Sequence, residues 1–220
     1  FKIENPTAVL YSNVVWDARL HFIDNTFKDM VSWIEETVKQ FENMPDRNLI
    51  IRTHPGEIIS HSKSRERLRD LKLLRNQNQN ILFIDAEEKI SSYELARFSK
   101  LNLIYASKIA MELCVMPAPI ITCGDAWIKN KNATISPKTK EDYFKYLRGD
   151  WEKLNILCNK RNGLAYAYHI FERKPLRFNY LETSKDRKSF FVNIEKLKND
   201  IKNYKNNSFS KIENLNSNNL

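Results

Sequence analysis

The feature that most constrains this chain is the alternation of short apolar runs, rich in β-branched residues, with longer stretches of helical periodicity. Such runs predict strands, and five follow one another: Ala8–Asn13, Leu49–Ile51, Ile81–Ile84, Leu103–Tyr105 and Ile120–Ile121. Because successive parallel strands need a long crossover, usually a helix, this order predicts a parallel sheet with helices on both faces. We therefore expect an α/β fold.

The helices are predicted from capping residues and apolar faces. In the first, Thr26 with Asp29 resembles a capping box, and Met30, Ile34 and Val38 share one face. The expected helices cover residues 26–41, 62–75, 91–98, 107–115, 139–147, 151–171 and 190–204. We place one domain at residues 1–182 and a Lys- and Asn-rich tail at residues 183–220, partly helical and then disordered.

The composition limits the class of protein. With 220 residues, 42% hydrophobic, the chain can form one well-cored domain with an appendage. It has no run of 18 apolar residues, as a membrane span would need, and its three scattered cysteines predict neither a disulfide framework nor a metal site. We expect a reducing, cytoplasmic location. Because the sequence opens on Phe1, we also expect it to be part of a longer protein.

The net charge of +9 indicates an anionic partner, which could be nucleic acid, a membrane surface or a phosphorylated ligand. No nucleic-acid-binding signature accompanies the basic residues. We therefore expect no nucleic acid. Much of the excess positive charge lies in Lys63–Arg75, which is typical of a solvated helix face, and in the Lys- and Asn-rich tail beyond Lys185. Peripheral contact of the basic surface with the inner face of the membrane is a further expectation.

The stretch Leu49–Glu57 carries the strongest site signal. A buried strand is followed at once by a cation, an imidazole and a carboxylate, namely Arg52, His54 and Glu57. In open parallel sheets, ligands bind beyond the carboxyl ends of the strands. Pro55 restricts His54 to an extended backbone, which favours a ring directed at that edge. The alternative is an ordinary loop with solvated charges.

Three other strands also end in polar residues, which are Asp17, Ser107 and Asp125. Ser107 is expected to open a helix, whose free N–H groups and dipole favour a phosphate, and Lys108 adds positive charge. Glu112 lies about one turn further on, where a carboxylate can accept hydrogen bonds from ribose hydroxyls. Taken separately, Ser107 could be a plain N-cap and Glu112 an exposed helix residue.

These segments together resemble the nucleotide-binding half of bacterial capsular-polysaccharide and surface-glycan glycosyltransferases of the GT-B type. The resemblance covers residues 8–171. It is carried by Asn13-Val-Val-Trp-Asp17, Ile51-Arg-Thr-His-Pro-Gly-Glu57, Tyr105-Ala-Ser-Lys-Ile-Ala-Met-Glu112, Pro119-Ile-Ile-Thr122, Asn132-Ala-Thr134 with Tyr143-Phe144, and Leu164-Ala-Tyr-Ala-Tyr-His169. Two departures are Ala110 and Pro117-Ala118, which stand where the family usually has glycine.

The resemblance implies a Rossmann-like domain, the C-terminal half of a GT-B fold, that transfers a sugar from a nucleotide-sugar donor. It implies that His54 and Arg52 are catalytic and stabilise the departing phosphate. It also implies a set of residues that bind the nucleotide sugar: Asp17, Glu57, Ser107, Lys108, Glu112 and Thr134. No Asp-x-Asp pair is present, so we expect neither a metal nor a cofactor.

The resemblance also implies a glycan or lipid-linked acceptor, bound by an N-terminal domain or a partner chain. Two alternatives stay open. One is a non-catalytic nucleotide-sugar-binding or scaffold domain in a glycan assembly complex. The other is a sugar-nucleotide 2-epimerase, which shares the GT-B architecture.

Overall fold

The structure is a computed structural model that describes residues 1–15, 26–59, 67–71, 78–175, 180–186 and 189–202. The chain divides into two compact units, residues 1–167 and 168–220. The sequence-based boundary after residue 182 lies inside the second unit. Each unit is described by itself.

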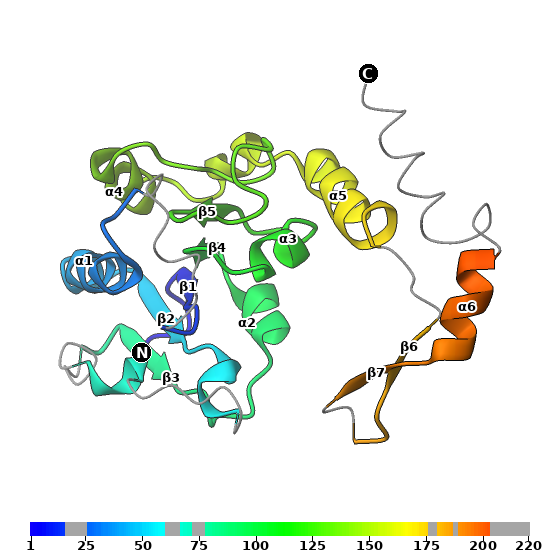
Figure 1. Ribbon diagram of the computed structural model, residues 1–220. Coiled ribbons are helices and arrows are strands. Elements are labelled where there is room, and N and C mark those ends of the chain that lie inside the picture. The colour runs from blue at the N-terminus through cyan, green and yellow to red at the C-terminus, as the bar shows by residue number, and fades with distance from the viewer. Residues whose placement is uncertain (16–25, 60–66, 72–77, 176–179, 187–188, 203–220) are drawn as a thin grey trace. The chain divides into compact units, whose positions relative to one another are not determined.

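The first unit is built on one five-stranded parallel sheet with the strand order β3-β2-β1-β4-β5 (Figure 1). The strands are β1 Thr7–Tyr11, β2 Asn48–Arg52, β3 Ile81–Ile84, β4 Leu101–Ile104 and β5 Ile120–Thr122. In the register, Leu10 of β1 lies opposite Ile51 of β2 and Leu103 of β4. The predicted α/β, Rossmann-like fold is thereby confirmed.

The strand order creates a natural ligand site. The chain runs outward from β1 through β2 to β3, then returns to β4 on the other side of β1 and continues to β5. The crossovers on the two sides of β1 therefore diverge. This topological switch leaves a crevice beyond the carboxyl ends of β1 and β4, the usual ligand position in open α/β sheets.

Helices cover both faces of the sheet, as predicted. In Figure 1, α1 (Met30–Glu42) and α4 (Lys140–Arg148) lie on one face, and α2 (Ser92–Phe98) and α3 (Ile109–Leu113) lie on the other. The first helix starts later than expected. Asp29 has an extended backbone and accepts a hydrogen bond from Ser32 N at 2.7 Å, so it is the N-cap, and the expected start at Thr26 is wrong.

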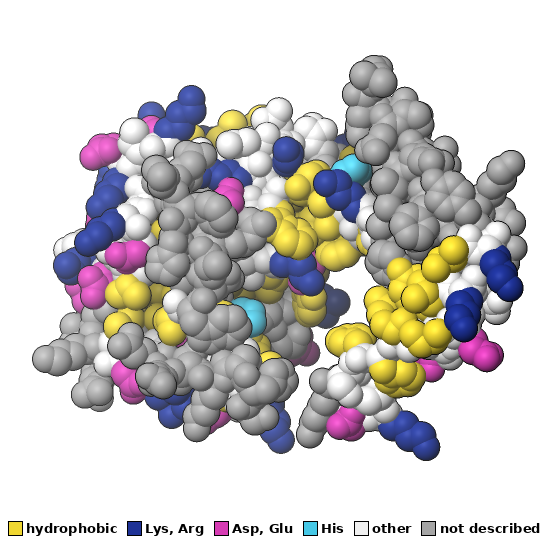
Figure 2. Space-filling view, viewed as in Figure 1, with side chains coloured by type: hydrophobic (Ala, Val, Ile, Leu, Met, Phe, Trp, Pro, Cys, Tyr) yellow, Lys and Arg dark blue, Asp and Glu magenta, His cyan; other side chains and the backbone are white. Residues whose placement is uncertain are grey.

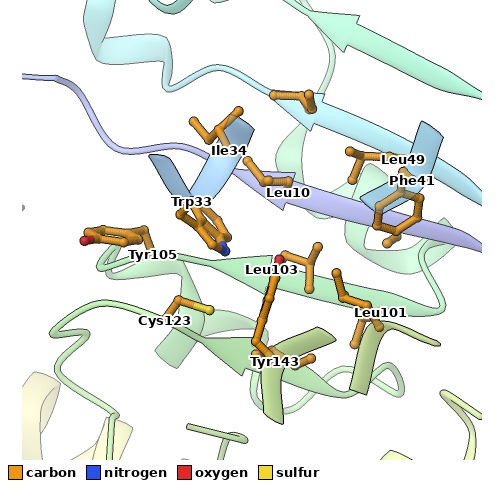
Figure 3. Packing of buried hydrophobic residues seen from close by; sticks show 14 of the residues in the cluster. Leu10, Trp33, Ile34, Phe41, Leu49, Leu101, Leu103, Tyr105, Cys123 and Tyr143 are labelled. Carbon is orange, nitrogen blue, oxygen red and sulfur yellow. The ribbon is translucent and has the colours of Figure 1, made fainter. Parts of the chain in front are cut away.

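The main core lies between the sheet and the α1/α4 layer. Figure 3 shows Trp33, Tyr105 and Tyr143 packed among the leucines of β1, β2 and β4. The Tyr143 hydroxyl shares a 2.7 Å hydrogen bond with the hydroxyl of Thr37, which satisfies both buried groups. This packing fixes the sheet whose edge carries the site.

The predicted basic helix at residues 62–75 is wrong for the part that the structure describes. Residues 67–71 form a short 3-10 turn, Leu68–Asp70, and the rest of that range lies outside the described residues. Arg67 and Arg69 both form ion pairs with Asp85 and Glu87 after β3. Tertiary ion pairs, which the local pattern does not contain, hold this turn.

The predicted continuous helix at residues 151–171 is interrupted. It comprises a 3-10 turn Lys153–Leu157, the helix α5 (Lys160–Tyr168) and a π-helical turn His169–Arg173. Asn159 causes the break, because its N–H donates to Asn132 O at 2.9 Å while its side chain accepts from Asn162 N. A residue that caps a new helix cannot continue the preceding one.

The second unit contains a hairpin and a helix. Strands β6 (Leu181–Thr183) and β7 (Phe190–Val192) pair antiparallel, and α6 (Ile194–Lys202) follows. The predicted helix at residues 190–204 therefore starts too early, because Phe190–Val192 is a strand. Figure 2 shows hydrophobic side chains gathered on this unit, and Phe190, Phe191 and Ile194 are exposed. Within the described residues, no helix is long and apolar enough to span a bilayer.

Candidate functional site

A pocket of about 230 Å³ lies at the carboxyl edge of the sheet. Its walls come from the ends of β1 and β2, from the start of α2 and from the segment that follows β4. The lining residues are Tyr11, Ser12, Arg52, Thr53, His54, Pro55, Ser92, Tyr93, Ser107, Lys108, Ile109 and Glu112. An adjoining hollow of about 300 Å³ shares His54, Ser107 and Lys108 with it. We call the two together the edge pocket.

His54 is held at the centre of the edge pocket by its backbone and its ring. Its φ of −65° and ψ of 125° are extended, as Pro55 requires, and its N–H donates to Ser12 Oγ at 3.0 Å. Ring nitrogen Nδ1 accepts a hydrogen bond from Gly56 N at 2.9 Å. Because Nδ1 is an acceptor, the proton of the neutral imidazole is on Nε2. His54 is therefore arranged as an Nε2–H donor.

Gly56 is required by this arrangement. A Cβ at this position would lie 2.8 Å from His54 Nδ1 and 3.2 Å from a methyl group of Val14. Both distances are shorter than ordinary van der Waals contacts. A larger residue at position 56 would therefore require the imidazole to move away from the start of the short 3-10 helix Pro55–Ile58.

The helix after Ser107 begins one residue later than the prediction placed it. α3 begins at Ile109 with Lys108 as its N-cap, while the Ser107 carbonyl accepts from Ala110 N at 3.2 Å and Ser107 Oγ is 3.5 Å from Ile109 N. A helix of five residues has a small dipole. Ser107 and Lys108 line the edge pocket, and a phosphate bound at this helix end stays a prediction. Asn13 Oδ1 accepts from Ala106 N at 3.2 Å and ties this segment to the end of β1.

Glu112 lies on the wall of the edge pocket and is held by two partners. Its Oε2 accepts a hydrogen bond from the Tyr93 hydroxyl at 2.8 Å, and its Oε1 is 4.0 Å from Lys108 Nζ. The hydrogen bond to Glu112 raises the pKa of Tyr93, and burial and the carboxylate charge act in the same direction. The carboxylate is thereby fixed at the pocket rim.

Arg52 lines the edge pocket, but its charge is used within the fold. Nη1 donates to the carbonyl of Asp85, and Nη2 donates to the carbonyl of Glu88 at 3.2 Å. The residue is 4% exposed, and burial lowers the pKa of its guanidinium while Glu88 opposes that shift. Arg52 holds the loop after β3, which is a positioning role, and the expected catalytic role stays a prediction.

Two predicted ligands lie away from the edge pocket. Glu57 is fully buried, with Oε2 accepting from Leu68 N at 3.4 Å, and burial raises the pKa of its carboxyl. Thr134 is buried beside β5, where its hydroxyl bonds that of Thr122 at 3.1 Å. Asp125 is not among the lining residues either. Asp17 lies outside the described residues.

The structure adds lining residues that sequence reasoning missed, chiefly Tyr11, Thr53 and Tyr93. Tyr93 could have been found from its place just after the capping residue Ser91, at a helix start on the carboxyl side of β3. Thr53 Oγ1 and Arg52 Nε are buried and have no hydrogen-bond partner in the described part of the chain.

A metal site is not found in the described residues, since no group of three or more His, Cys, Asp or Glu side chains lies close enough to hold an ion. The polar chemistry of the edge pocket consists of an imidazole donor, an ammonium group, hydroxyls and one carboxylate. Such a combination of donors and an acceptor suits a ligand that carries both an anionic group and hydroxyls.

No protein-family model matches the sequence, and no curated protein matches it. Among solved structures, the chain is similar to the β-Kdo 2,4-transferase KpsC of Thermosulfurimonas dismutans, with 15% identity and a TM-score of 0.49, covering 71% of this chain and 44% of that one. It is similar to the UDP-GlcNAc 2-epimerase of Methanocaldococcus jannaschii, with 16% identity, a TM-score of 0.44, and coverage of 76% and 45%.

A third similar structure is the wall teichoic acid polymerase TagF, with 13% identity, a TM-score of 0.44, and coverage of 74% and 38%. The chain spans less than half the length of each of these three proteins. Similarity at this level carries no conclusion about activity.

Proposed function

We propose that this chain binds a nucleotide sugar in the edge pocket and is the donor-binding domain of a glycosyltransferase that makes capsule or another surface polysaccharide. The observation that carries the proposal is the convergence of His54, Ser107, Lys108 and Glu112 on one pocket. These residues come from two separate motifs of the resemblance. They lie where the strand order predicts a ligand.

The ligand would lie with its phosphates near His54 and Lys108 and its ribose near Glu112. The Nε2–H group of His54 and the Lys108 ammonium are donors suited to phosphate oxygens. Glu112 is an acceptor suited to sugar hydroxyls. One pocket thus offers both donors and an acceptor, with Lys108 Nζ and Glu112 Oε1 4.0 Å apart on one wall.

The reaction would break the bond between the anomeric carbon of the sugar and a phosphate oxygen. The electron pair of that bond goes to the phosphate, and the acceptor hydroxyl forms the new bond and loses its proton. Preorganised donors stabilise charge as it develops, so His54 and Lys108 would favour departure of the nucleotide. The acceptor, its binding domain and contact with a membrane surface remain predictions.

Non-catalytic binding of a nucleotide sugar is the second candidate function. The observation in its favour is that Arg52, one of two expected catalytic residues, donates to the carbonyls of Asp85 and Glu88 within the fold. His54 is then the remaining catalytic candidate. An assay for release of free nucleotide from a bound donor, in the presence of glycan acceptors, separates the two functions.

The proposal is tested by calorimetric titration of CMP, UDP, GDP and their sugar conjugates against the wild type and His54→Ala. We expect one nucleotide series to bind, and His54→Ala to weaken it by about tenfold or more, because a hydrogen bond to a charged group is lost. EDTA should leave binding unchanged.

The matched control is His169→Ala, which removes an imidazole from the π-helical turn outside the edge pocket. It should bind like the wild type. Unchanged affinity in a folded His54→Ala protein, or binding that needs added magnesium or manganese, would contradict the proposal.

A further inference from the structure

We propose that Tyr93 and Glu112 together recognise the ribose. The phenol oxygen accepts a hydrogen bond from one ribose hydroxyl, and the carboxylate accepts a hydrogen bond from the other. This inference rests on the proposed function and assigns the specificity of the same pocket. Tyr93 belongs to none of the segments that carry the family resemblance. It comes from the first turn of α2, across the pocket from the segment that carries Glu112.

The two oxygens of the Glu112 carboxylate have different partners. Oε2 receives the Tyr93 hydroxyl hydrogen at 2.8 Å, whereas Oε1 is 4.0 Å from Lys108 Nζ, beyond hydrogen-bond distance. Oε1 therefore accepts no hydrogen bond from Lys108, whose ammonium only lies near it, and a ligand hydroxyl can donate to Oε1. We expected both oxygens to accept from the ribose, but Oε2 is already used.

The phenol supplies the missing acceptor. A tyrosine hydroxyl has one hydrogen and also accepts hydrogen bonds. Because the Tyr93 hydroxyl donates its hydrogen to Glu112, its oxygen can only accept a hydrogen bond from a ligand hydroxyl. Hydrogen bonding to an anionic carboxylate also increases the negative charge on the phenol oxygen, which strengthens it in that role. Two acceptors on two neighbouring residues match the two adjacent hydroxyls of a ribose.

The position of Tyr93 fits a ligand contact better than a packing role. The residue is 46% exposed, and α2 packs on the sheet through other residues, Leu95 and Ala96, which are buried. A half-exposed ring that holds a pocket carboxylate contributes little to the core. Removing its hydroxyl should therefore change ligand recognition and leave folding intact.

The experiment is a calorimetric titration of Tyr93→Phe with the best-bound nucleotide of the panel and with its 2′-deoxy and 3′-deoxy forms. In the wild type, we expect the removal of either hydroxyl to weaken binding. In Tyr93→Phe, the ribonucleotide should bind about tenfold more weakly, because one acceptor is gone. One of the two deoxy forms should then bind as well as the ribonucleotide, since the hydroxyl that Tyr93 reads no longer has a partner.

Tyr168→Phe is the control, because Tyr168 is an exposed tyrosine outside the edge pocket. It should keep the wild-type preference for both hydroxyls. If Tyr93→Phe keeps the full wild-type preference for both the 2′- and the 3′-hydroxyl, the role of Tyr93 in ribose recognition is overturned, while the proposed function stands. If the wild type binds no nucleotide at all, the proposed function fails and this inference fails with it.

Discussion

At the scale of single residues, the conformation of His54 depends on two neighbours with opposite properties. Pro55 restricts the His54 backbone, and Gly56 leaves room for its ring while its N–H donates to Nδ1. The first effect could be predicted from the sequence and is confirmed, because it needs only adjacent residues. The ring contact could not, since it depends on the turn that follows.

Gly56→Ala should displace the His54 imidazole, because the added methyl group would lie 2.8 Å from Nδ1. We expect nucleotide affinity to fall nearly as far as in His54→Ala, about tenfold, with the histidine still present. The measurement is calorimetric titration alongside thermal unfolding. Gly149→Ala is a control, since its Cβ would meet only the backbone at the end of α4. Wild-type affinity in Gly56→Ala would show that the ring position does not matter.

Because of its hydrogen bond to Glu112, Tyr93 should lose its phenol proton at a higher pH than an ordinary tyrosine. Its pKa in the folded protein lies above the ordinary value of about 10. The bond therefore contributes its full stability below that ordinary value, and the contribution is lost as pH rises through the folded pKa. The tyrosinate absorbance of the wild type minus that of Tyr93→Phe isolates this group. Its midpoint should fall in Glu112→Gln, and an identical midpoint in both backgrounds would contradict the contact.

At the scale of elements, the strands of the parallel sheet could be predicted from sequence, whereas the turns between them and the β6–β7 hairpin could not. Each strand of the sheet is a short apolar run, and all but β3 are fully buried, so local composition is enough to identify it. The helix expected at residues 62–75 rests on the helical spacing of three apolar residues, Leu68, Leu71 and Leu74. The turn observed there is held by ion pairs with Asp85 and Glu87, which are distant in sequence. Local periodicity does not contain that information.

The same limit applies to the candidate site. Polar residues after a strand were expected to face the ligand, but sequence alone does not say whether such a side chain turns outward or into the fold. Glu57 is buried away from the pocket, where it accepts from Leu68 N, and Arg52 lines the pocket while its guanidinium holds the carbonyls of Asp85 and Glu88. His54, Lys108 and Glu112 line the pocket as expected.

Arg52→Met tests the positioning role of Arg52. Methionine fills similar space but leaves the carbonyls of Asp85 and Glu88 without their donor. We expect the free energy of unfolding to fall by about 1–3 kcal/mol, as measured by chemical denaturation without ligand. His54→Ala is the comparison and should change stability much less. A stable Arg52→Met protein that has lost only ligand affinity would support the catalytic assignment.

At the scale of the whole molecule, the first unit contains everything the proposed binding needs. The main hydrophobic core and all residues of the edge pocket lie within residues 1–167. A chain of residues 1–174, which keeps α5 and the π-helical turn whole, should fold cooperatively and bind nucleotide with the affinity of the full chain. Circular dichroism on heating and calorimetry check this. Loss of binding in a folded truncated protein would place part of the site in the second unit.

The central claim is that the edge pocket recognises a ribonucleotide, and one comparison tests it most directly. The measurement is the affinity of the wild type for a ribonucleotide and for its 2′-deoxy analogue, by calorimetry under identical conditions. An unpaired acceptor beside the ligand costs about 1–3 kcal/mol, so we predict that the ribonucleotide binds about tenfold or more tightly. Equal affinities for the two nucleotides would contradict the ribose role of Glu112 and, with it, the proposed reading of the pocket.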